Sequence, residues 1–259
     1  MNPLYFGSSD RPLYGVYHAP KARTGRRTGV VLCYPFGQEY MRAHRAFRQL
    51  AMLLAKAGFH VFRFDYRCTG DSSGDGEDFT LAGAVDDTVQ AIEELQDMAD
   101  VTNVVLLGLR LGGATAARVA QAHDSVTHLV LWDAIADARV YLEELRAKAN
   151  VPVSVGGGTE QPTFGVMGFP VPPALQRELY DLRLAEETPP SALRVLVVCD
   201  SETPDTRSLC THYRVGSKLA DSLIAPLPGR WDEVDNWGSA MIPQEAIQSI
   251  VVWVTSEVA

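Results

Sequence analysis

The chain has 259 residues, 46% of them hydrophobic and 21% charged, and its formal net charge is −9 at pH 7. The length suits one α/β domain or two small ones, and the composition is ordinary for a soluble globular protein. The acidic balance disfavours non-specific binding to nucleic acid, no apolar run approaches the ~20 residues that span a bilayer, and residues 1–5 lack the character of a signal peptide.

Strands and helices are expected to alternate along the first hundred residues. Residues 4–20 alternate in polarity, as an antiparallel pair of edge strands does. Apolar, β-branched runs predict buried strands at 29–34 and 60–65. Apolar residues at three- and four-residue spacing predict a helix over 43–57, between these two strands, and a second helix over 82–98.

The alternation continues to the end of the chain with one interruption, at residues 134–191. This segment separates two predicted core strands and is too long for a simple connection. We interpret it as a lid over a pocket, the alternative being a surface excursion with no gating role. The remaining elements are strands at 103–108, 128–132, 194–199 and 222–227, helices at 114–122, 141–149, 174–184 and 243–254, and a glycine run at 156–158.

This order of elements predicts an α/β fold with a mostly parallel, doubly wound sheet. Its core is expected to consist of residues 1–133 and 192–259, with the lid inserted between them. The four cysteines, Cys33, Cys68, Cys199 and Cys210, show no Cys-x-x-Cys spacing. Neither a metal cluster nor a redox pair is therefore indicated, and we expect a cytoplasmic protein without metal or cofactor.

The most informative motif is the turn Gly108-Leu109-Arg110-Leu111-Gly112, which joins a predicted strand to a predicted helix. Strand, Gly-x-X-x-Gly turn and helix form a nucleophile elbow, in which residue X projects from a strained turn into a pocket. Here X is Arg110. A guanidinium group stays protonated and has no free lone pair, so it cannot attack a carbonyl carbon.

With these motifs, the whole chain resembles the α/β-hydrolase superfamily. The loop Tyr34-Pro35-Phe36-Gly37-Gln38-Glu39 stands where these proteins keep an oxyanion-hole amide, and Asp65 to Gly74 resembles their Asp-x-Arg-Gly-x-Gly-x-Ser turn. The elbow and the position of the insertion complete the likeness. More narrowly, the Gly-Leu-Arg-Leu-Gly elbow and the stretch Gly168 to Leu175 resemble the bacterial exosortase-A-system-associated hydrolases, a subgroup that also carries arginine at the elbow.

The resemblance implies a Ser–acid–His triad in that chain order, and only the acid position is filled. Arg110 replaces the serine, while Asp200 or Glu202 follows the strand at 194–199 and could serve as the acid. The histidine should follow the strand at 222–227, where the sequence has Trp231 and no histidine occurs after His212. Ordinary serine hydrolysis is therefore not expected.

Arg110 lies at the start of a helix, where free amides and the helix dipole already favour anions. It is therefore a candidate receptor for a carboxylate or phosphate. Alternatively, Arg110 pairs with Glu39, Asp133 or Asp200 and fills a disused pocket. A third interpretation combines the two, with the acid holding Arg110 until an anionic ligand displaces it.

The other candidate residues surround the elbow. Glu39 could act as a general base, or it could form an ion pair with Arg42 or Arg45, which we favour. The amides of Phe36 and Gly37 and the residue after the elbow, Leu111, are candidate ligand contacts. Trp231 and Phe36 could line an apolar site or fill the space of a lost triad.

A relocated nucleophile, Cys33 or Cys68 with His44 as base, is a further alternative. The leading hypothesis is a divergent α/β-hydrolase-fold protein that binds a small anionic or acyl-bearing molecule and catalyses elimination, decarboxylation or cyclisation. In that case Arg110 binds a carboxylate or stabilises a developing oxyanion of the ligand, and Glu39 or Asp200 transfers a proton. The alternatives are a non-catalytic scaffold in a biosynthetic assembly, with a protein partner or as a homo-oligomer, and a residual esterase or thioesterase.

Overall fold

The computed structural model describes residues 1–21, 25–149, 151–152, 162–189, 193–217, 219–233 and 241–258. Its main feature is an eight-stranded sheet in the order β1-β2-β4-β3-β5-β6-β10-β11. The β1–β2 and β2–β4 pairings are antiparallel, and every pairing from β4 to β11 is parallel. The strands are β1 (Asn2–Phe6), β2 (Leu13–His18), β3 (Thr28–Cys33), β4 (His60–Phe64), β5 (Asn103–Leu109), β6 (Val126–Trp132), β10 (Arg194–Cys199) and β11 (Leu219–Ile224).

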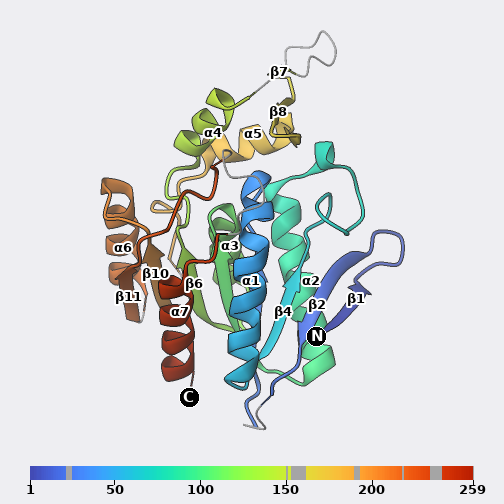
Figure 1. Ribbon diagram of the computed structural model, residues 1–259, viewed down its shortest axis with the longest axis vertical. Helices are drawn as coiled ribbons and strands as arrows, with labels where there is room; N and C mark the ends of the chain where they lie inside the picture. The colour runs from blue at the N-terminus through green and yellow to red at the C-terminus, as the bar shows by residue number, and fades with distance from the viewer. Residues whose placement is uncertain are drawn as a thin grey trace.

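Helices cover both faces of the sheet (Figure 1). Helices α1 (Gln38–Lys56) and α7 (Gln244–Glu257) pack against each other, and α2 (Leu81–Ala99) packs against α3 (Leu111–Ala122). Helix α6 (Pro204–Gly216) lies against β10 and β11. Because both faces are covered, β3 is buried along its whole length and β5 along all but its first residue, as parallel sheets require.

The segment between β6 and β10 lies at the end of the sheet where the parallel strands finish, and it carries α4 (Ala138–Ala147) and α5 (Pro173–Asp181) (Figure 1). A small antiparallel sheet joins β7 (Val151–Pro152), β8 (Phe164–Val166) and β9 (Phe169–Val171). The Glu178 carboxylate of α5 accepts the Leu81 and Ala82 N–H groups of α2 at 2.6 and 3.0 Å. These two hydrogen bonds satisfy two free amides of α2 and fasten α5 to the core. The glycine run at 156–158 lies outside the described residues.

Most of the predicted elements match observed ones to within a few residues, and the differences described next bear most on the site and on the inserted segment. Helix α1 begins at Gln38, five residues earlier than expected, because Gly37 adopts φ +62° and starts the helix without a side-chain cap. Glu39 is therefore in the first turn of a helix. Strand β11 spans Leu219–Ile224, so the predicted strand at 222–227 was placed three residues too far toward the C-terminus. The β8–β9 hairpin lies where the pattern predicts no strand.

Candidate functional site

The elbow between β5 and α3 places Arg110 in a strained backbone conformation, with φ +53° and ψ −120°. Its backbone N–H donates to the Trp132 carbonyl at 3.0 Å. The turn is closely packed, because a Cβ atom added at Gly112 would lie 2.3 Å from the Cys33 carbonyl oxygen. Only glycine fits there, and this explains the glycine spacing of the motif.

Arg110 forms an ion pair with Glu39. Its Nε donates to Glu39 Oε1 at 3.0 Å, and its Nη1 donates to the Asp133 carbonyl at 3.4 Å. The Tyr141 hydroxyl donates to Glu39 Oε2 at 3.3 Å, and the guanidinium lies over the Tyr141 ring, 5.6 Å from its centroid. Three distant segments, α1, the elbow and α4, therefore meet at one buried carboxylate.

Burial and the ion pair with Arg110 shift the pKa of Glu39 in opposite directions. Its side chain is 4% exposed, whereas that of Arg110 is 22% exposed. Burial raises the pKa of Glu39 above its ordinary value, although Arg110 partly offsets this effect. Burial also acts to lower the pKa of Arg110, but the neighbouring Glu39 carboxylate outweighs it and the pKa is raised. Arg110 is thus held as a cation beside a carboxylate that takes up a proton more readily than usual.

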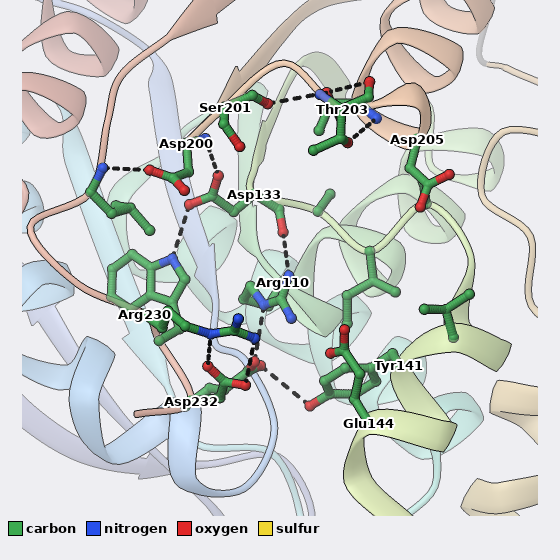
Figure 2. Close-up of a pocket in the computed structure, with 18 of the residues that line it drawn as sticks. Arg110, Asp133, Tyr141, Glu144, Asp200, Ser201, Thr203, Asp205, Arg230 and Asp232 are labelled. Carbon is green, nitrogen blue, oxygen red and sulfur yellow. Dashed lines mark hydrogen bonds and ion pairs between the residues drawn. The ribbon is translucent and has the colours of Figure 1, made fainter. Parts of the chain in front are cut away.

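Asp133 follows β6 directly and has the left-handed φ of +43°. Its Oδ1 accepts the Asp200 backbone N–H at 2.7 Å, and its Oδ2 accepts Nε1–H of Trp231 at 2.9 Å (Figure 2). Burial raises its pKa to about 6. Strain and a raised pKa at one residue are features that functional sites share.

Two cavities adjoin this network. An outer cavity of about 350 Å³ lies in front of Arg110, and Trp231, Asp133 and Asp200 are among the residues that line it (Figure 2). An inner cavity of about 280 Å³ is lined mainly by apolar groups, including Phe36 and Phe169. The two cavities share Glu39, Tyr141 and Asp232 as a common wall.

The structure brings together some of the predicted site residues and separates others. Glu39 pairs with Arg110 and not with Arg42 or Arg45 as we favoured, because its place in the first turn of α1 directs it inward; Arg42 instead pairs with Glu233. Asp200 lines the rim of the outer cavity with an exposed side chain that accepts the Leu227 N–H, and it does not pair with Arg110.

The predicted ligand contacts divide between the two cavities. Phe36 and Gly37 line the inner one and Trp231 the outer one. Leu111 is 2% exposed and lines neither cavity among the described residues, so its side chain belongs to the core. Sequence reasoning missed Tyr141 and weighed Asp133 only as a partner of Arg110. The position of Asp133 directly after a buried strand was the available signal.

The relocated-nucleophile alternative finds no support in the geometry. Cys33 is buried beside Thr88, and burial raises the pKa of its thiol to about 12. Burial also raises the pKa of Cys68. His44 stacks on Tyr34, and within the described residues neither thiol bonds to a histidine. A thiol with a raised pKa and no base is a poor nucleophile.

The order of the eight strands, the elbow at β5 and the cavity above it define an α/β-hydrolase fold. Residues 30–183 match the alpha/beta hydrolase fold family model. The chain therefore belongs to the alpha/beta hydrolase family. No curated protein matches it by sequence.

Several solved structures share the fold. The chain is similar to Est1E from Butyrivibrio proteoclasticus with ferulic acid bound, at 15% identity and a TM-score of 0.72, covering 98% of this chain and 97% of that one. It is also similar to proline iminopeptidase from Mycobacterium smegmatis, at 14% identity and a TM-score of 0.66, covering 99% and 97% of the two chains. The Pyrococcus furiosus esterase Pf2001 is similar at 12% identity and a TM-score of 0.63, covering 100% of this chain and 93% of that one. At these identities the likeness shows the fold alone. None of the described helices is long and apolar enough to cross a bilayer.

Proposed function

We propose that this protein binds a small acyl-bearing molecule in the elbow cavity and catalyses proton-transfer chemistry, such as elimination, decarboxylation or cyclisation, in place of serine hydrolysis. The observation that carries the proposal is the Arg110–Glu39 pair at the elbow, which joins a fixed cation to a buried carboxylate beside a cavity. In an α/β-hydrolase fold, the elbow residue faces the reacting group of the ligand.

Arg110 supplies charge stabilisation in this proposal. Its Nε and Nη1 are engaged, whereas Nη2 has no acceptor among the described residues. A carbonyl or carboxylate oxygen of the ligand accepts from Nη2, and the guanidinium stabilises negative charge that develops on that oxygen. This is the combined interpretation of the sequence, in which Glu39 holds Arg110 in place until a ligand oxygen arrives.

Glu39 moves the proton. It lines both cavities, and its raised pKa brings it nearer to neutral pH, where a general acid or base is most effective. When the ligand oxygen takes over part of the interaction with Arg110, Glu39 becomes a stronger base. The segment at 134–191 contributes Tyr141, which orients Glu39 and forms part of the wall above the elbow, and we propose that this segment acts as the lid.

The test compares ligand binding with serine-hydrolase reactivity. A fluorophosphonate probe should not label the protein, since Arg110 replaces the nucleophile. A thermal-shift screen of small carboxylates and amides, with ferulic acid included because the similar Est1E binds it, should raise the melting temperature of the wild type. Arg110→Met should abolish the shift.

Arg45→Met is the matched control, because Arg45 is an exposed residue of α1 and lines neither cavity. It should leave the shift intact. Strong probe labelling, or a shift that survives Arg110→Met, would contradict the proposal. If no compound stabilises the protein, the scaffold alternative is favoured.

A further inference from the structure

Two cysteine side chains meet between β10 and α6. Cys199 is the last residue of β10, and Cys210 lies on α6, which packs against that strand. The two thiols share a hydrogen bond, both are free, and both line a third cavity, of about 220 Å³. Ten residues separate them in the chain. The pair therefore lacks the Cys-x-x-Cys spacing of a redox motif, and the packing of α6 on the sheet creates it.

Cys210 is the more accessible thiol of the pair. It is half-buried, whereas Cys199 is 5% exposed. Burial raises the pKa of both thiols, that of Cys199 to about 12. At Cys210 the Cys199 thiol, the Arg214 charge and the Ser222 hydroxyl act to lower the pKa and offset part of the effect of burial. Cys210 is therefore the thiol that ionises more readily and meets a reagent in the cavity.

The segment between the two cysteines forms one wall of the outer cavity (Figure 2). Cys199 precedes Asp200, whose backbone N–H donates to Asp133 Oδ1 at 2.7 Å. The wall thus begins and ends close to the two thiols. A bond between Cys199 and Cys210 would close the segment into a short loop and restrict its conformations. The residues of the segment that line the outer cavity are Asp200, Ser201, Thr203, Asp205 and Thr206.

We infer that Cys199 and Cys210 are a site of reversible disulfide formation, oxidised by low-molecular-weight disulfides, and that the bond restrains this wall of the outer cavity. The Cys210 thiolate attacks one sulfur of the reagent, so that a mixed disulfide forms and one thiolate of the reagent leaves. The Cys199 thiolate then attacks the Cys210 sulfur and releases the second one. The two cysteines are oxidised, the reagent is reduced to two thiols, and the two cysteine protons pass to the leaving thiolates.

The raised pKa of the thiols slows this exchange without preventing it. A catalytic nucleophile must ionise in every turnover, whereas a disulfide has to form only once. Thiolate is the attacking species, and below the pKa its fraction increases with pH. The rate of disulfide formation should therefore rise about tenfold from pH 7 to pH 8. The site does not depend on the reaction proposed for the elbow cavity.

Peptide mapping tests the inference directly. The folded protein is incubated with bis(2-hydroxyethyl) disulfide, a small uncharged reagent, and the remaining thiols are blocked with N-ethylmaleimide after unfolding. Trypsin cleaves after Arg194, Arg207 and Arg214, so Cys199 and Cys210 fall in separate peptides, 195–207 and 208–214. Mass spectrometry should find these two peptides joined, with the loss of two hydrogen atoms, and should find Cys33 and Cys68 alkylated. Dithiothreitol should separate the joined peptides.

Two serine variants and hydrogen exchange connect the bond to the cavity wall. In the oxidised wild type, exchange of the amides at 200–206 should slow relative to the reduced protein, because the loop is closed at both ends. Cys210→Ser, treated in the same way, should show neither the joined peptides nor the slower exchange. Cys68→Ser is the matched control, because Cys68 is also half-buried but lies in the turn after β4. It should retain both responses.

Four results would overturn the inference. They are the absence of joined peptides in the wild type, a mixed disulfide on Cys210 that Cys199 does not displace, a rate of formation that does not rise with pH, and unchanged exchange at 200–206 in the oxidised protein. Each of them leaves the function proposed for Arg110 and Glu39 untouched, because those residues take no part in the thiol chemistry.

Discussion

The Trp231 indole nitrogen donates a hydrogen bond to Asp133 Oδ2 over 2.9 Å, in the loop after β11 where the family places its histidine. Like the imidazole of a triad, this indole holds a carboxylate at the end of a strand. Unlike imidazole, it has no acceptor nitrogen and cannot take a proton from a nucleophile. The pair supports the proposal that the cavity does not operate by serine hydrolysis.

The Arg110–Glu39 pair should be strongly coupled. Removing the cation with Arg110→Met leaves a buried carboxylate unpaired and should lower the free energy of unfolding by about 3 kcal/mol. Glu39→Gln should also be costly, because it leaves the guanidinium without its counter-charge. The double variant should lose less than the sum of the single losses, and urea denaturation at pH 7 measures all three. Strictly additive losses would show that the two side chains do not stabilise each other.

Asp133 should make stability depend on pH. Burial raises its pKa in the folded protein to about 6, above the ~3.9 of an unfolded chain. The folded state therefore binds more protons between these values, and the wild type should lose stability relative to Asp133→Asn as pH rises from 4 to 7. Melting temperatures of both proteins across this range give the difference. A difference that stays constant would mean that Asp133 does not titrate near pH 6.

Glu178 should fasten the inserted segment to the core. Its carboxylate accepts two N–H groups at the start of α2, so Glu178→Ala should cost about 1 kcal/mol, as loss of a helix cap does. Hydrogen exchange at Leu81 and Ala82 should accelerate, because these amides lose their acceptor. Glu93→Gln, at an exposed site on the same helix, is the control and should leave both amides protected. Unchanged exchange in Glu178→Ala would argue against this attachment.

The elbow glycines should tolerate no side chain. At Gly112 an added Cβ would lie 2.3 and 2.4 Å from the carbonyl oxygens of Cys33 and Tyr34, so Gly112→Ala should destabilise the protein by about 3 kcal/mol, a cost at the upper end for overpacking. At Gly165 nothing lies within 4 Å of an added Cβ. Gly165→Ala should therefore stay within about 0.5 kcal/mol of the wild type. Thermal unfolding of both variants checks the contrast, and equal stabilities would contradict it.

Local patterns allowed most of the fold to be predicted. The strands at 29–34, 60–65 and 103–108 are apolar because parallel strands are covered on both faces, and their order along the chain already indicated a doubly wound sheet. The start of α1 was missed because a glycine, not a capping side chain, begins it. The β8–β9 hairpin was missed because its strands have only three residues each, too few for a period to show.

The sequence by itself determined the elbow, because the glycine spacing around Arg110 is local and reflects steric contacts within a few residues. It also showed that arginine stands at the centre of this turn and that no histidine follows His212 in the chain. Only the tertiary structure decided which acid meets which partner: Glu39 and Arg110 are 71 residues apart, and Asp133 and Trp231 are 98 apart. Such pairs depend on strand order and on the path of loops between strands. Many carboxylates in the sequence are equivalent until the fold buries a few of them beside particular donors.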